Sequence, residues 1–108
     1  MNTSYTYIAN LNDALPALTT DTIVSRTLAH DENSRVVLFG FAPGQELSEH
    51  TSPMQATLHF LAGEATITLG DETLEVTAGA WVQMAPRLPH SIRAKDGPVV
   101  MLLTMNKV

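Results

Sequence analysis

The stretch PGQELSEHTSPMQATLHFLAGEATITLGDE, residues 43–72, decides the fold of this chain. Within it, residues 64–69 alternate between apolar and polar side chains, which is the period of a half-buried β-strand. The Gly-Asp pair at 70–71 is typical of a tight hairpin, and residues 72–76 supply its return strand. The stretch therefore predicts antiparallel strands joined by short turns.

The rest of the chain continues this pattern. Further β-like runs lie at residues 22–30, 35–42, 56–62, 80–85, 90–94 and 99–105. About nine short strands, separated by turn residues and without a long helix, predict an all-β sandwich or barrel. Residues 9–20 carry leucines at helical spacing but are interrupted by Pro16, which predicts a short helical turn or a strap. We expect one domain over residues 1–108, with a core barrel at about 35–104 and an N-terminal arm at 1–34.

Composition excludes several classes of function. The chain has 108 residues, 44% hydrophobic and 16% charged, with a net charge of −5 and no run of Lys or Arg, so we expect no nucleic-acid partner. No apolar run approaches the roughly 18 residues that cross a bilayer, so we expect no membrane association. Cysteine is absent, which excludes disulfides and thiol nucleophiles. The first ten residues lack a basic start and an apolar core, and we therefore expect no signal peptide and a cytoplasmic location.

Two blocks of residues have a recognisable spacing. The first block is Gly44, five residues, His50-Thr51-Ser52, and then Ala56 seven residues before Gly63. The second block, GAWVQMAPRLPHSIRA, contains Gly79, a bend at Ala85-Pro86-Arg87, then His90, and Ala94. On these residues the chain resembles the cupin superfamily of small, single-domain, conserved-barrel proteins. This resemblance covers roughly residues 35–104 and implies an RmlC-like jelly roll, also called a double-stranded β-helix.

The resemblance also implies a degenerate metal site. His50 and His90 match two metal ligands of the family, while Ser52 stands where a second histidine is usual and Ala56 where a glutamate is usual. Imidazole ligands suit Mn, Fe, Ni, Cu or Zn, but two imidazoles alone hold a divalent metal weakly. We therefore expect either one weakly held divalent transition metal at His50 and His90 or no metal at all.

Strand alternation assigns faces to the neighbouring residues. His50 and Ser52 share a face, which we expect to point into the barrel, as does Glu46 nearer the rim. His59 should point outward unless a bulge inverts it, and a local bulge would also be needed to bring the Gln55 amide to the site. Gln55 and His59 are thus candidate additional ligands.

Other polar and soft side chains complete the expected pocket. Gln83 is a candidate for the pocket wall, and His30 is most simply a surface residue. Met54, Met84 and Met101 would give an adaptable wall for an apolar or aromatic molecule.

Three classes of function remain open. The first is a metal-dependent oxygenase or isomerase of small molecules, and the second is a metal-free module that binds or senses a ligand. The third is a metal-free enzyme in which His50 or His90 is a general base, although no inward carboxylate is evident to orient it. We predict a small-molecule pocket in the barrel interior, lined by His50, Ser52, Gln55, Gln83 and His90, and leave enzymatic activity open. The resemblance further implies a homodimer, in which residues 22–30 could add to a partner's sheet.

Overall fold

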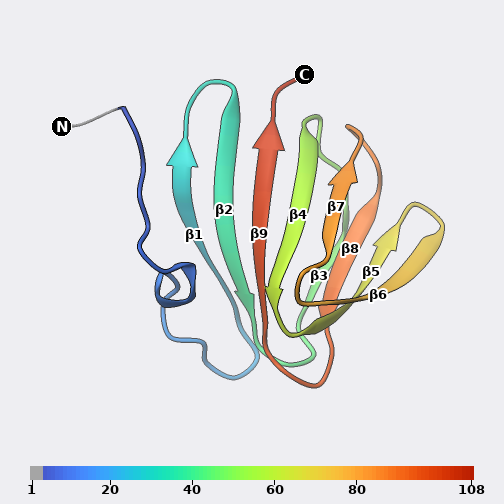
Figure 1. Cartoon of the computed structure of the whole chain (residues 1–108). Coiled ribbons are helices and arrows are strands. Elements are labelled where there is room, and N and C mark those ends of the chain that lie inside the picture. Colours follow the sequence, from blue (N-terminus) through green and yellow to red (C-terminus); the bar gives the residue numbers. More distant parts are fainter. Residues whose placement is uncertain (1–3) are drawn as a thin grey trace.

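Antiparallel strands in two facing sheets make up nearly all of the computed structural model, which describes residues 4–108 (Figure 1). The strands are β1 (Ile23–His30), β2 (Ser34–Phe41), β3 (Glu46–His50), β4 (Gln55–Ala62), β5 (Glu64–Leu69), β6 (Glu72–Thr77), β7 (Trp81–Met84), β8 (His90–Ala94) and β9 (Val99–Asn106). One sheet has the order β1-β2-β9-β4-β7 and the other β3-β8-β5-β6. The expected all-β jelly roll is confirmed.

The core lies between the two sheets because each strand alternates as its sequence indicates. In β4, Ala56, Leu58 and Phe60 are buried, whereas the residues between them are half-buried. Ala65 and Ile67 do the same in β5 from the opposite sheet. Together with aromatic and aliphatic residues of β2, β8 and β9, they form one contiguous apolar cluster that fills the barrel.

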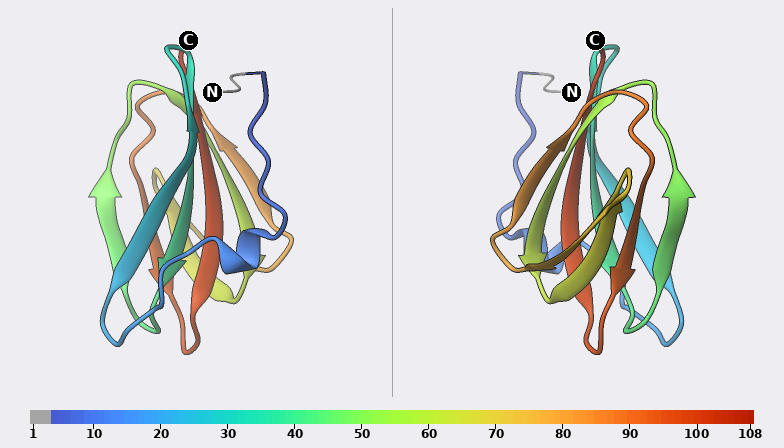
Figure 2. Two further views of the ribbon diagram at one scale, coloured as in Figure 1. Left: turned by 90° about the vertical axis from the view of Figure 1, so that its left-hand side faces the viewer. Right: turned by 90° about the vertical axis from the view of Figure 1, so that its right-hand side faces the viewer.

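The N-terminal segment is a strap with one short helical turn, as expected. The 3-10 helix η1 (Leu11–Asp13) is capped by Asn10, whose side-chain oxygen accepts a hydrogen bond of 3.0 Å from the Asn12 N–H. The Arg26 guanidinium of β1 donates to the Ala14 carbonyl at 3.0 Å, which fixes the strap to the sheet. Figure 2 shows the strap running outside the five-stranded sheet. Residues 1–3 of the expected arm lie outside the described residues.

The strand β1, which the sequence assigns to the arm, forms one edge of the five-stranded sheet. Pairing of this edge with a second copy of the chain stays a prediction. Within residues 4–108 the structure contains no helix that is long and apolar enough to cross a membrane.

Two bulges change which residues face the interior at one end of the barrel. We call this end the mouth: β1, β3, β7 and β9 end there, and β2, β4 and β8 begin there (Figure 1). In β1 the register shifts between Thr27 and Ala29, and in β3 it shifts between Leu47 and His50. An extra residue in a strand reverses the face of every residue that follows it. Each shift lies just before the end of its strand, so the reversed residues lie at the mouth.

Candidate functional site

His50 and His90 lie side by side at the mouth. They are register partners at the end of β3 and the start of β8, and their ring centroids are 4.2 Å apart with the planes tilted by 58°. His90 is buried, with 6% of its surface exposed, because it follows the alternation that also buries Ile92. His50 is exposed at the rim. The structure thus brings together the two histidines that the sequence singles out.

The ring nitrogens of both histidines have defined roles. Nδ1 of His50 lies 2.8 Å from the Ser48 carbonyl oxygen, and Nδ1 of His90 lies 2.9 Å from the Leu88 carbonyl oxygen. A carbonyl oxygen only accepts, so Nδ1 is the donor in each case. In the neutral rings, both Nε2 atoms therefore carry a lone pair that can bind a ligand or accept a proton.

The bulge in β3 explains why His50 faces inward although Glu46 does not. Glu46 pairs with Arg93 on the outer face, and Leu47 pairs with the buried Ile92 on the inner face. Strict alternation from Leu47 would turn His50 outward, and the extra residue reverses it. The expectation that Glu46 shares the face of His50 is therefore wrong, because it assumed a regular strand.

The residues present do not complete a metal site. In residues 4–108, no three His, Asp or Glu side chains gather in a group that could hold a metal ion. Ala56, in the usual place of the glutamate, presents a buried methyl group. Ser52 lies beyond the end of β3, and its hydroxyl accepts a hydrogen bond of 3.1 Å from the Met54 N–H. The chain thus supplies two of the four ligands of the family pattern, which does not fit a tightly held catalytic metal.

Gln55, His59 and Gln83 do not reach the inner face. Gln55 and His59 alternate with the buried residues of β4, and Gln83 is exposed and pairs with Thr57 on the same outer face. The register of β4 stays regular until Phe60, so no bulge turns the Gln55 amide inward. This corrects the expectation that Gln55 and Gln83 line the pocket, and it removes Gln55 and His59 as additional ligands. The outward direction expected for His59 on a regular strand is confirmed.

The barrel interior is filled, and the cavity lies at the mouth instead. Phe41, Leu58, Phe60, Ile67 and Met101 are at most 1% exposed, which leaves no room for a ligand among them. A cavity of about 660 Å³ opens at the mouth. We call it the mouth cavity; the residues that line it are His30, Asp31, Glu32, Ser34, Arg35, Pro53, Met54, Arg87, Met105, Lys107 and Val108. Its volume is in the usual range for small-molecule sites.

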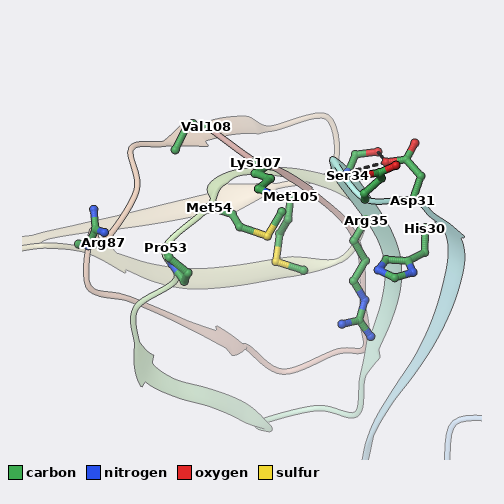
Figure 3. A pocket seen from close by; sticks show the side chains of 11 residues that line it. His30, Asp31, Ser34, Arg35, Pro53, Met54, Arg87, Met105, Lys107 and Val108 are labelled. Atoms are coloured by element: carbon green, nitrogen blue, oxygen red, sulfur yellow. Dashed lines mark hydrogen bonds between the residues drawn. The ribbon is translucent and has the colours of Figure 1, made fainter.

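His30 and Arg35 are mouth residues that the sequence did not single out. They are register partners on β1 and β2, and the bulge in β1 gives His30 the same inward face as Arg35. Figure 3 shows Met54 and Met105 between Arg87 on one side and Arg35 with His30 on the other. His30 is exposed, as the sequence predicts, and the register shift before it, invisible in the sequence, places it on the wall of the mouth cavity.

Arg87 adopts an unusual backbone conformation. Its φ angle is +69°, in the left-handed region that glycine adopts readily and other residues avoid. Its N–H donates to the Ser52 carbonyl at 2.7 Å, which ties the bend between β7 and β8 to the loop between β3 and β4. An arginine therefore holds a strained position at the rim of the mouth cavity.

Comparison with known proteins agrees with this architecture. A family model described as the cupin domain matches residues 37–105. A conserved protein of unknown function from Streptococcus pyogenes is 30% identical with a TM-score of 0.85, over 100% of this chain and 93% of that one. A cupin superfamily protein from Desulfitobacterium hafniense is 25% identical with a TM-score of 0.81, over 86% of this chain and 84% of that one. No curated protein gives a significant match.

Proposed function

We propose that this chain, which belongs to the cupin family, binds a small molecule at the mouth of its barrel. The observation that carries the proposal is the mouth cavity of about 660 Å³ at the end of an otherwise filled barrel. A concave site with apolar walls and a few polar groups is the usual form of a small-molecule site. The pair His50 and His90 lies at the same end, with both Nε2 atoms able to accept a hydrogen bond from a ligand.

A fragment screen followed by 15N–1H correlation spectra tests the proposal. Ligands should shift the amide signals of mouth residues such as Arg35, Met54 and Met105. A second, smaller hollow of about 330 Å³, lined in part by Asp21 and Pro98, lies at the opposite end and is an internal control. Shifts that gather around that hollow, or a screen without any binder, would contradict binding at the mouth.

A second candidate function is the binding of a divalent transition metal by His50 and His90. It is favoured by the two hydrogen bonds that fix Nδ1 as the donor in each ring and leave Nε2 free for a metal. With two protein ligands the affinity should be weak, and a bound molecule would have to complete the coordination.

Titration with Zn2+ tests the second candidate on protein without a histidine tag. Zinc should shift the imidazole signals of His50 and His90, and a His50→Ala, His90→Ala double variant should lose that response. His59→Ala is the matched control, because His59 lies on the outer face opposite Trp81. If the double variant binds zinc as well as His59→Ala does, the two-histidine site is refuted while small-molecule binding at the mouth remains open to its own screen.

A further inference from the structure

We infer that the mouth cavity selects a small carboxylate with an apolar body, and that the Arg35 guanidinium holds the carboxylate. This inference rests on the proposed function and names the class of ligand. It depends on three features of the cavity: a cation without a hydrogen-bond partner, two carboxylates (Asp31 and Glu32) that form no ion pair with it, and a soft apolar surface next to it.

Arg35 lies on the inner-face side of β2 at the beginning of the strand, where its side chain is exposed at the mouth. It pairs with Met105 of β9, which in turn pairs with Ala56 of β4, so these three residues form one cross-strand row on the inner face. Among residues 4–108 the ion pair joins Lys95 and Glu75, so Arg35 takes part in none. Within the same residues the Arg35 side chain also has no hydrogen-bond partner. Its charge is therefore available to a ligand.

The two acidic residues that line the cavity, Asp31 and Glu32, form no ion pair with Arg35. Ala56 stands where a glutamate is usual in the family pattern, so this position adds no negative charge to the cross-strand row that contains Arg35. Asp31 is bound within its own turn, where its Oδ1 accepts from the N–H groups of Asn33 at 2.7 Å and Ser34 at 2.8 Å. Figure 3 shows the Asp31 carboxylate turned to Ser34, while the Arg35 guanidinium extends in the opposite direction beside His30.

The form of the site favours a carboxylate over a phosphate. A guanidinium offers two parallel N–H groups that match the two oxygens of a carboxylate. Phosphate sites usually gather several backbone N–H groups at a helix N-terminus or a glycine-rich loop. The walls of the mouth cavity are strand ends and turns, and the one helix among residues 4–108 is the three-residue η1 in the strap.

The neighbouring surface favours an apolar body. Met54 and Met105 lie between the two arginines of the cavity, and Pro53 also lines it. Methionine side chains adapt to the shape of an apolar ligand. A chain with a net charge of −5 repels anions in general, so a local cation with an apolar surface is the feature that would retain one.

Hexanoate, its neutral analogue hexanamide, acetate and inorganic phosphate are suitable probes, each titrated into 15N-labelled protein. Hexanoate should shift the amide signals of Arg35, Met54 and Met105, and it should bind about tenfold or more tightly than hexanamide or acetate. Arg35→Gln should weaken hexanoate binding by about tenfold to a hundredfold. Arg93→Gln is the matched control: it removes the same charge from the outer face of the other sheet and should leave binding unchanged.

The possible results separate this inference from the proposed function. If hexanamide binds at the mouth as tightly as hexanoate, or if Arg35→Gln binds as the wild type does, the carboxylate assignment is overturned and small-molecule binding at the mouth stands. Tighter binding of phosphate than of hexanoate also overturns the assignment. Failure of hexanoate to bind up to its solubility limit overturns it as well, and the fragment screen then decides the proposed function separately.

Discussion

Replacing Gly63 by alanine should destabilise the barrel severely. Gly63 turns the chain from β4 into β5 with a φ angle of +87°, and a Cβ atom there would lie 2.1 Å from the Pro98 carbonyl oxygen and 3.0 Å from Val99 Cα. A left-handed backbone costs a residue with a side chain about 1–2 kcal/mol. The clash involves backbone atoms that no rotamer change can move, and relief of such overpacking costs about 1–3 kcal/mol more. The expected loss of about 2–5 kcal/mol is a large share of the stability of an ordinary domain.

Gly79→Ala separates the two costs. Gly79 has a φ angle of +98°, but no atom lies within 4 Å of the position of its Cβ. This variant should lose only the backbone contribution, about 1–2 kcal/mol. Urea unfolding monitored by far-UV circular dichroism gives the free energy of unfolding of each variant against the wild type. Equal losses in the two variants would refute the reasoning, because the close approach of Pro98 would then carry no cost.

The remaining predictions concern the core, the rim and the turn before β2. Phe60→Ala should lower the free energy of unfolding by about 3–5 kcal/mol, because Phe60 is 1% exposed in the filled core. Urea unfolding measures the loss, and a loss below about 1 kcal/mol would contradict the close packing around Phe60. Arg87→Gly should leave the free energy of unfolding unchanged or raise it by up to about 1 kcal/mol, because glycine adopts a positive φ without strain. Arg87→Ala should not raise it, because alanine keeps the strain. A melting temperature that falls for Arg87→Gly alone would contradict this. Hydrogen bonds from the N–H groups of Asn33 and Ser34 hold the pKa of the Asp31 carboxyl below its usual value. The stability that Asp31 contributes is therefore fully present above the unfolded-state pKa and is lost as the pH falls through the folded-state pKa. Asp31→Ala should therefore lower the urea midpoint at neutral pH, and the difference from wild type should shrink in acid; a difference independent of pH would contradict the assignment.

The fold follows from the sequence where strands keep a strict period of two between turn residues. Residues 56–60 and 64–67 alternate without interruption, and their buried faces match the apolar positions. The positions of Gly63 and Gly79 also predict turns, because both require a positive φ. Local patterns are sufficient here because face and turn are local properties of the backbone.

The candidate site was less predictable because it depends on irregular backbone. A bulge adds one residue whose position no local pattern announces, yet it reverses the face of everything after it. Glu46 is therefore predicted to face the interior, and this prediction is wrong. His30 is exposed as predicted, but the shift in β1 places it on the wall of the mouth cavity. Arg35 is not predicted as a site residue for a different reason. A charged residue at the beginning of a strand usually lies on the surface, and the face of Arg35 depends on its pairing with Met105, far along the chain.

Several departures from regular structure gather at the mouth. The bulges in β1 and β3 direct His30 and His50 inward there, and Arg87 holds a left-handed conformation at the same end. Each departure lowers stability relative to a regular strand or a glycine, and a barrel that only needed to fold would gain nothing from it. The opposite end also has irregular backbone, with a register shift in β4 between Phe60 and Ala62 and a positive φ at Asp21, but the hollow described there is lined by no cation or imidazole. This difference in lining residues supports ligand binding at the mouth independently of the cavity volume, because charge and volume are separate properties of a cavity.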